Sequence, residues 1–165
     1  MNKIDRNYLE IHSLDDLVES NSPSKEFNID LVNPPNFQLN RFFYKNIGKN
    51  HRWTDRLDWS EKQWIDYSSS KKVKTYVLKK SNELVGYFEL NIHQDETEIA
   101  YLGLLEEYHN KKLGSYLLSI AIKKSFFNKP KRVWVHTCSL DHKYALKNYL
   151  SRGMKIFKSE VININ

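Results

Sequence analysis

The stretch Thr97–Leu118, TEIAYLGLLEEYHNKKLGSYLL, decides the fold of this chain. Its first half leads from two polar residues into a largely apolar run, which is typical of a strand. From Leu113 the apolar residues recur at the spacing of an amphipathic helix. The turn between them is basic and reaches Gly114 near the helix start. A helix that begins after a strand presents unpaired N–H groups and the positive end of its dipole, so the stretch predicts a site for a phosphorylated cofactor.

The composition indicates one folded domain over residues 1–165. Of its 165 residues, 40% are hydrophobic and 13% aromatic, which is sufficient for a substantial core. No apolar stretch approaches membrane-spanning length and the N-terminus lacks a signal-peptide pattern, so we expect a soluble cytoplasmic protein. The net charge of +6 suits an anionic cofactor or an acidic partner without identifying either. Cys138 is the single cysteine, so no intramolecular disulfide can form and we expect no metal site.

The rest of the pattern alternates strands and helices around the opening stretch. A Ser60 to Gln63 capping box starts one helix, and Gly48 and Gly153 are expected to end two others. Asp141 is expected to cap the last helix. Strands are predicted at residues 7–12, 26–32, 72–80, 83–92, 97–105, 131–140 and 154–164, and helices at 37–47, from 60, from 113 and at 142–152.

These elements predict how the sheet is connected. Residues 72–105 read as an antiparallel meander with short turns. The strand–helix–strand unit from 97 to 138 requires a right-handed crossover, which makes its two strands parallel. We therefore expect an α/β (α+β) fold in which helices pack on both faces of a mixed, mostly antiparallel sheet.

The order of elements resembles the GNAT superfamily of acetyl-CoA-dependent N-acyltransferases. The family's cofactor turn reads roughly Gln/Arg-x-x-Gly-x-Gly/Ala. His109, Lys112 and Gly114 occupy those positions, so only the last glycine is kept. The C-terminal positions that match the family's spacing are Ala145, Tyr149 and Gly153-Met154, with His142 where the family has Asn.

A finer resemblance covers residues 35–158. The chain looks like an uncharacterised bacterial GNAT subgroup, whose pattern implies no particular acceptor. The segments that carry this likeness are Arg41–Tyr44, Trp53–Ser60, Gly86–Leu90, Glu98–Leu105 and Arg132–His142.

The resemblance implies direct transfer of an acetyl group from acetyl-CoA to a primary amine. The amide of Leu104 would lie where the two parallel strands splay apart and would polarise the thioester carbonyl. The amide of Leu105 or Glu106 would pair with the cofactor, and Gly103 would mark the bulge that makes the splay. Backbone amides of the turn would hold the pyrophosphate. The implied cofactor-binding residues are Leu104, Leu105, Glu106, His109, Asn110, Lys111, Lys112, Leu113, Gly114, Ser115 and Tyr149.

The two lysines of the turn have two interpretations. Lys111 and Lys112 could add charge attraction to phosphate, or they could be solvated side chains at a helix start. Lys112 would be harmless with a negative φ and an outward side chain, and would obstruct binding if the cofactor must approach the backbone closely.

Tyr149 is the expected general acid, because it matches the family's acid position. A phenol with an ordinary pKa of about 10 is protonated at neutral pH and can donate to a departing thiolate; the alternative is a helix tyrosine packed on the sheet. Glu98 is the expected base, directly or through water, since burial would raise its pKa. The alternative is an edge carboxylate paired with Arg or Lys. Glu89 is a rival base, and both glutamates could instead recognise a cationic substrate.

His136 shares a strand face with Trp134 and Cys138. Its near-neutral pKa suits a base, and a hydrogen-bonded core histidine is the alternative. Direct transfer needs no acyl-enzyme, so we do not expect Cys138 to be a nucleophile.

The acceptor pocket is expected in the irregular region 41–59. Aromatic walls and a fixed positive charge suit a specific small-molecule site. Arg56 could bind a substrate carboxylate, or it could pair with Asp55 or Asp58. The expected substrate-binding residues are Tyr44, Trp53, Arg56, Glu89 and His136.

The leading hypothesis is an N-acetyltransferase that acts on a small-molecule or peptide amine. The alternative, favoured by the altered cofactor turn, is a catalytically inactive CoA-binding sensor or interaction domain of the same fold. Neither nucleic acid nor membrane is an expected partner, since the basic residues are dispersed and no nucleic-acid motif is present. The last strand, 154–164, could pair across a homodimer interface.

Overall fold

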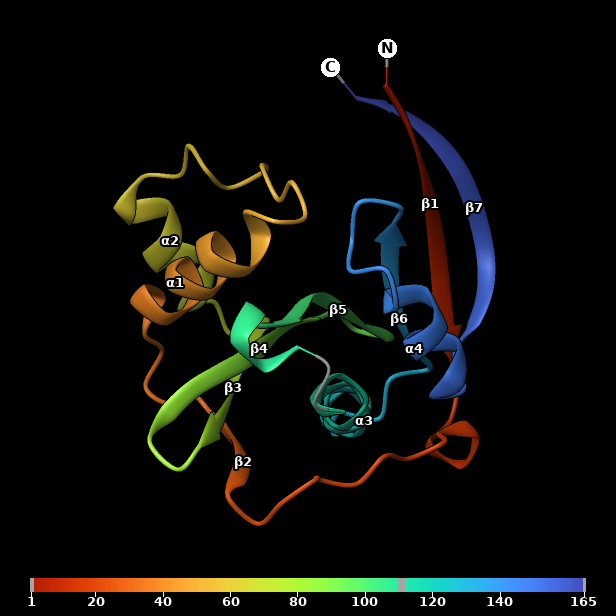
Figure 1. Cartoon of the computed structure of the whole chain (residues 1–165), viewed down its shortest axis with the longest axis horizontal. Helices are drawn as coiled ribbons and strands as arrows, with labels where there is room; N and C mark the ends of the chain where they lie inside the picture. Colours follow the sequence, from red (N-terminus) through yellow and green to blue (C-terminus); the bar gives the residue numbers. More distant parts are fainter. Residues whose placement is uncertain (1, 110–111, 165) are drawn as a thin grey trace.

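A mixed sheet forms the centre of the molecule (Figure 1). The computed structural model describes residues 2–109 and 112–164, and over these residues seven strands pair in the order β2-β3-β4-β5-β6-β1-β7. Neighbouring strands are antiparallel except β5 and β6. The strands are β1 (Asn2–Ile11), β2 (Phe27–Leu31), β3 (Val73–Lys80), β4 (Glu83–Ile92), β5 (Glu96–Leu104), β6 (Arg132–Cys138) and β7 (Lys155–Ile164). The helices are α1 (Phe37–Gly48), α2 (Glu61–Ser68), α3 (Leu113–Ser125) and α4 (Ala145–Ser151), with short 3-10 turns at Leu14–Asp16 and Glu106–Tyr108.

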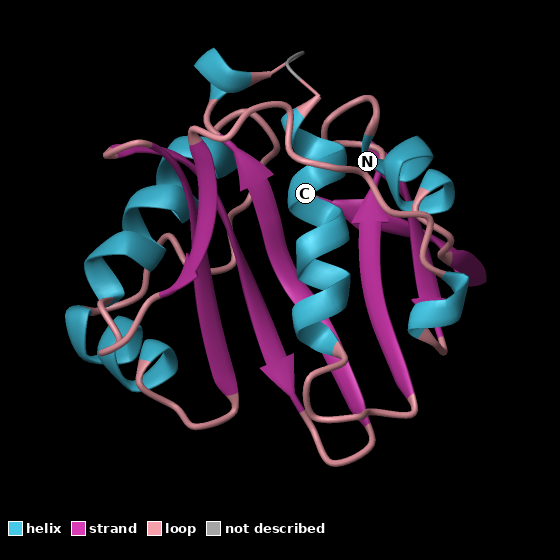
Figure 2. Cartoon of the chain, turned by 90° about the horizontal axis from the view of Figure 1, so that it is seen from below, coloured by secondary structure: helices cyan, strands magenta, loops and turns pink. Residues whose placement is uncertain are grey.

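Helices cover both faces of this sheet, which confirms the predicted fold class. α1 and α2 pack together on one face, while α3 lies against β4 and β5 on the other, beside α4. Figure 2 shows α3 along its length, in front of the strands. A larger apolar core that includes Leu117 and Val133 lies under α3 and α4, and a smaller one that includes Phe43 and Tyr87 lies under α1. The two cores hold the sheet between two helical layers.

The N-terminal strand β1 lies inside the sheet, between β6 and β7. Leu9 and Ile11 are buried in the larger core, so the residues that alternate with them face the opposite side. The strand begins at Asn2, five residues before the predicted start, because its pairing with β7 extends to Ile164. This pairing brings residues near the N-terminus beside the last strand of the chain (Figure 1).

The start of α4 differs from the prediction. The helix begins at Ala145, and Asp141 does not cap it. The Oδ2 of Asp141 instead accepts hydrogen bonds from Thr137 Oγ1 at 2.7 Å and from the Cys138 amide at 2.9 Å. The carboxylate therefore closes the turn after β6, which is the local alternative that short polar side chains offer the backbone.

Two glycines end helices differently. Gly153 follows α4 with φ +104°, and a Cβ there would lie 2.1 Å from the Asp16 carbonyl oxygen, so the predicted stop is confirmed. Gly48 remains inside α1 and Lys49 caps that helix, so the predicted C-cap at Gly48 is wrong. A Cβ at Gly48 would lie 2.6 Å from the Cβ of Trp53, so this glycine allows the loop after α1 to return closely. The capping box at Ser60 and Gln63 is confirmed.

The predicted bulge at Gly103 is wrong. Glu89 pairs with Tyr101 and Leu90 pairs with Ile99, so the extra residue of β5 is Ala100. Gly103 serves a different purpose, since a Cβ there would lie 2.7 Å from Cγ2 of Ile47. The glycine allows α1 to approach the sheet.

Candidate active site

A cavity of about 810 Å³ opens where β5 and β6 part. The two strands pair only from Glu96–Glu98 to Arg132–Trp134, and no pairing continues toward their carboxyl ends within the described residues. We divide part of the cavity wall into two sides. The turn side includes Leu104, His109, Lys112, Leu113, Gly114, Ser115, Asn148 and Tyr149. The aromatic side includes Arg6, Trp53, Asp55, Tyr101, His136 and Cys138.

The backbone of Leu104 points into this opening. The amide of Leu105 donates to the Val85 carbonyl at 2.8 Å, so 85 and 105 form a hydrogen-bonded pair. Residue 104, opposite Gly86, then forms a non-hydrogen-bonded pair, and its N–H and C=O face away from β4. The Leu104 amide is therefore directed to the side where β6 has diverged. The Leu105 amide, an expected cofactor contact, is already used by the sheet.

Backbone geometry also defines the turn before α3. Lys112 is the N-cap of α3 and has φ +60° and ψ +16°, a left-handed conformation in which L-residues are strained. The N–H groups of the first turn have no partner within the helix. A Cβ at Gly114 would make ordinary contacts, the nearest with Nδ2 of Asn148 at 3.7 Å. The first turn of α3 is open to the cavity, because Leu113, Gly114 and Ser115 line it. The expected contacts Asn110 and Lys111 lie outside the described residues.

Side chains around the turn fix its shape. Nε2 of His109 lies 3.1 Å from the Leu104 carbonyl oxygen, which requires the proton on Nε2 for a hydrogen bond. Nδ2 of Asn148 donates to the Gly114 carbonyl at 3.1 Å, and Oγ of Ser115 donates to the Lys112 carbonyl at 3.2 Å. The predicted contact Glu106 starts a 3-10 turn, with its Oε2 3.5 Å from Nδ2 of Asn50.

Tyr149 lies on the turn side of the cavity and is buried. Burial raises the pKa of its phenol well above the ordinary value, and the nearby Asp141 carboxylate raises it further. The phenol therefore keeps its proton throughout the physiological range, as a general acid requires.

The two predicted glutamates occupy different places. Glu98 is partly buried beside Trp134, at the last paired position of β5 and β6, and burial raises its pKa as expected. Glu89 is fully buried and accepts hydrogen bonds from Asn40 Nδ2 at 2.8 Å, from Arg56 Nη1 at 2.9 Å and from the Tyr67 hydroxyl at 2.8 Å. Neither glutamate belongs to the cavity wall among the described residues.

The partner of Arg56 is therefore Glu89, not Asp55 or Asp58. Burial alone would lower the pKa of the guanidinium, but the Glu89 carboxylate, with smaller contributions from Tyr67 and Tyr101, raises that pKa overall. The guanidinium carbon lies 4.1 Å from the ring centre of Tyr67 and 4.4 Å from that of Tyr101. We call Arg56, Glu89, Asn40 and Tyr67 the buried network.

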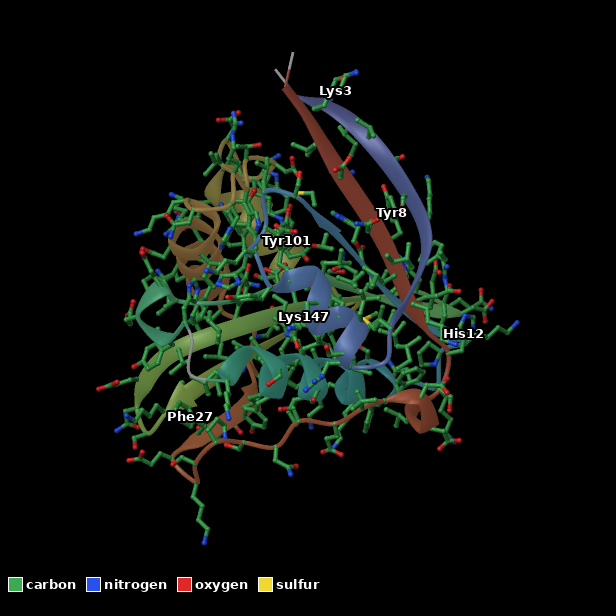
Figure 3. All side chains as sticks on the ribbon, turned by 45° about the vertical axis from the view of Figure 1, so that its right-hand side comes forward. Lys3, Tyr8, His12, Phe27, Tyr101 and Lys147 are labelled. Carbon is green, nitrogen blue, oxygen red and sulfur yellow. The ribbon has the colours of Figure 1, made fainter. Side chains whose placement is uncertain are left out.

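The aromatic side of the cavity packs against this network, because the Tyr101 ring contacts Arg56. Trp53 and Tyr101 have ring centres 4.8 Å apart, and Tyr101 lies near the middle of the molecule (Figure 3). Tyr44, expected to bind substrate, is fully buried behind them, where its hydroxyl accepts a hydrogen bond from the Arg56 amide at 3.0 Å. His136 faces the cavity, and burial together with the charge of Arg6 lowers its pKa.

Sequence reasoning missed several cavity residues. Asn148 lies next to Tyr149 in the sequence, and Tyr101 lies midway between the expected residues Glu98 and Leu104. Arg6 gave no signal, because the place of β1 in the sheet is not visible in the sequence. His142 lies on the wall with its ring centre 4.8 Å from that of His109, and burial lowers its pKa.

Residues 2–109 and 112–164, which the structure describes, contain no group of three or more His, Cys, Asp or Glu side chains arranged to hold a metal ion. Their helices are too short or too polar to cross a membrane.

Solved structures share this fold at low sequence identity. A GCN5-related N-acetyltransferase from Kribbella flavida aligns with a TM-score of 0.69 at 14% identity, covering 95% of this chain and 56% of that one. An aminoglycoside acetyltransferase from an uncultured soil metagenomic sample aligns with a TM-score of 0.66 at 13% identity, covering 79% and 90%. The ribosomal-protein-S18-alanine N-acetyltransferase from Escherichia coli gives 0.60 at 15% identity, covering 77% and 76%. The chain thus spans just over half the length of the Kribbella protein.

Sequence comparison identifies the family. A search of curated protein sequences finds no match. The model of the Acetyltransferase (GNAT) family, in contrast, matches residues 33–154, which is most of the chain. This protein therefore belongs to the GNAT acetyltransferase family.

Proposed function

We propose that this protein is an N-acetyltransferase that transfers an acetyl group directly from acetyl-CoA to a primary amine. The observation that carries the proposal is the convergence of an unused Leu104 amide and the buried Tyr149 phenol on one cavity. Two structural neighbours are named for acetylating an aminoglycoside and a ribosomal-protein alanine, which are a small-molecule and a protein amine.

The turn side fits the phosphates of an acyl-CoA. The open first turn of α3, around Leu113, Gly114 and Ser115, offers unpaired N–H groups and the positive end of the helix dipole. These donors do not depend on side-chain identity, so a chain with His109 and Lys112 at positions that usually hold other residues keeps its phosphate site. Lys112 contributes charge attraction.

Each step of the transfer then has a residue to serve it. The amine nitrogen attacks the thioester carbonyl carbon, and the Leu104 N–H donates to the oxygen on which negative charge develops. The C–S bond breaks as the intermediate collapses, and the phenol of Tyr149 gives its proton to the departing thiolate.

A base must remove the proton that the attacking amine loses. His136 is favoured over Glu98 and Glu89, because it lines the cavity and its lowered pKa leaves the imidazole neutral at pH 7. Glu98 remains the alternative, acting through water. Glu89 is disfavoured, since its oxygens already accept three partners.

Assembly and location form part of the same proposal. β7 pairs only with β1 and forms an edge of the described sheet, so a second copy could pair there to make a homodimer. We propose a cytoplasmic location, where acetyl-CoA is available, with no nucleic-acid partner.

A panel of primary amines assayed for CoA release tests the function. We expect turnover with acetyl-CoA, and we expect Tyr149→Phe to reduce kcat by about 10²–10⁴-fold while calorimetric CoA binding is unchanged. Tyr116→Phe, on α3 outside the cavity wall, is the matched control and should behave as the parent. Failure to bind acetyl-CoA at millimolar concentration would refute the proposal. CoA binding without turnover of any amine would favour the inactive CoA-binding domain, and unchanged kcat in Tyr149→Phe would remove its role as acid.

A further inference from the structure

Arg6 lines the cavity that contains the proposed thioester site. It lies on β1, pairs in register with Cys138 on β6, and lines the aromatic side together with Ile4, His136 and Cys138. Its charge adds to burial in lowering the pKa of His136, so the guanidinium disfavours protonation of that imidazole. Arg6 is thus a fixed positive charge beside the proposed base.

The guanidinium of Arg6 has no partner in the described residues. Its Nε is buried without a hydrogen bond, and no carboxylate of the part of the chain that the structure describes lies within 4.0 Å of it. In contrast, Arg56 pairs with Glu89, and Arg132 pairs with both Glu10 and Glu96. Arg152, the C-cap residue of α4, also has a buried unpartnered Nε and also lines the cavity, but unlike Arg6 it does not lower the pKa of His136.

The carboxylates near Arg6 are committed elsewhere. Asp141 accepts from Thr137 and from the Cys138 amide, and Glu160, opposite Arg6 on β7, accepts from the Tyr8 hydroxyl at 2.7 Å. Asp55 lies at the exposed rim of the cavity. A partly buried cation that lacks a partner is costly in a folded protein, and a ligand that supplies the missing anion removes that cost.

We infer that the acceptor carries a carboxylate close to its amine and that Arg6 binds this carboxylate. The planar guanidinium matches a carboxylate with two parallel hydrogen bonds, and the rings of Trp53 and Tyr101 line the same side of the cavity. An amino acid, or a compound with the same arrangement, therefore fits this site better than a simple alkylamine. That the ligand also carries an acceptor amine rests on the proposed function, but the binding of a carboxylate by Arg6 does not.

Calorimetry with products tests the carboxylate site without requiring turnover. The probes are the twenty N-acetyl amino acids and their carboxamides, each titrated into the protein in the presence of CoA. At least one acid should bind about tenfold or more tightly than its amide, and Arg6→Gln should abolish the difference. Arg6→Lys should restore part of it, because it returns the charge without the planar fork. Lys3→Gln, which removes the same charge from an exposed position of β1 (Figure 3), is the matched control and should keep the full preference.

Thermal unfolding separates binding from a structural role. Arg6→Gln should unfold at the same temperature as the parent or higher, since the variant loses an unpaired charge. A large loss of stability would show that Arg6 supports the fold and would overturn the inference. So would equal affinity for acids and amides in the parent, an acid preference that survives Arg6→Gln, or no binding of any probe at millimolar concentration.

The amine panel distinguishes this result from failure of the proposed function. Turnover of amines without any carboxylate preference would leave the acetyltransferase intact and remove the role of Arg6. An Arg6-dependent preference for acids without turnover of any amine would support the carboxylate site and contradict the acetyltransferase function.

Discussion

The two sides of the cavity are built by different means. The turn side uses backbone groups: the amide of Leu104, the left-handed Lys112 and the open start of α3. The aromatic side uses side chains, and their positions depend on the buried network behind them. A site built from backbone tolerates changes of side chain, as His109 and Lys112 illustrate. A site built from side chains is where members of one fold can differ in substrate.

The buried network carries the larger energetic risk. Arg56 and Glu89 are both withdrawn from water, and their desolvation is offset only while each keeps its partners. Tyr101 connects this network to the cavity, because its ring contacts both Arg56 and Trp53. Damage to the network should therefore reach the aromatic side and leave the turn side intact.

The largest expected effect is that of Glu89→Gln. The variant leaves Arg56 as an uncompensated buried charge, so the free energy of unfolding should fall by about 3–5 kcal/mol in chemical denaturation. Asp66→Asn, which breaks an exposed pair with Lys62 on α2, is the control and should cost about 0.5 kcal/mol or less. The double variant Glu89→Gln with Arg56→Met should recover part of the loss. Equal costs for Glu89→Gln and Asp66→Asn would contradict the role of the network.

The next effect concerns His136. The reference pKa of a histidine is 6.5, and burial and Arg6 lower the value for His136, so its neutral form persists as the pH falls below 6.5. If His136 is the base, kcat should decline only below that pH, and His136→Gln should lose that decline together with about 100-fold of the rate at pH 7.

Glu98→Gln distinguishes the rival base. Burial raises the pKa of Glu98 above 4.5, so this glutamate would also give an acidic decline in kcat if it were the base. Each substitution should remove only the decline that its own residue causes. If the acidic decline in kcat persisted in His136→Gln and disappeared in Glu98→Gln, Glu98 and not His136 would be the base.

The smallest effect is expected on the turn side. Lys112→Gly relieves the left-handed strain and should raise the free energy of unfolding by up to about 1 kcal/mol, after the entropy that glycine gains in the unfolded chain is subtracted. Lys112→Ala loses the same charge but keeps the strain, and is the matched control. CoA should bind the Gly variant more tightly than the Ala variant in calorimetry. Equal stability of the two variants would contradict the strain.

Local patterns predicted most of the fold. The 72–92 hairpin, the Ser60 capping box, the crossover through α3 and the stop at Gly153 all follow from short-range rules, and the structure confirms them. The errors at Gly48 and Gly103 share a cause, because contacts with a returning segment (Trp53) and with a distant one (Ile47) decide what each glycine does. The error at Asp141 is different, since its carboxylate makes another local choice and bonds to Thr137 and to the Cys138 amide.

For the candidate site, the resemblance to the GNAT family implied that Tyr149 and Gly114 belong together, and both lie with His136 on the wall of one cavity. The sequence could not show that Glu89 would be closed off by Arg56, because the two are 33 positions apart and meet only when α1, the following loop and α2 fold over β4.

The sequence by itself determined the strand–turn–helix of residues 97–118, because hydrophobic period and turn chemistry are local properties. Only the tertiary structure decided what that element opens onto. β5 and β6 part after three paired positions, and β1 lies beside β6 in the sheet. Arg6 therefore lines the same cavity as Leu104, which is almost 100 residues later in the sequence. Pairing between strands that are distant in the sequence is fixed by burial of one whole face of the sheet, and a short stretch of sequence does not contain that information.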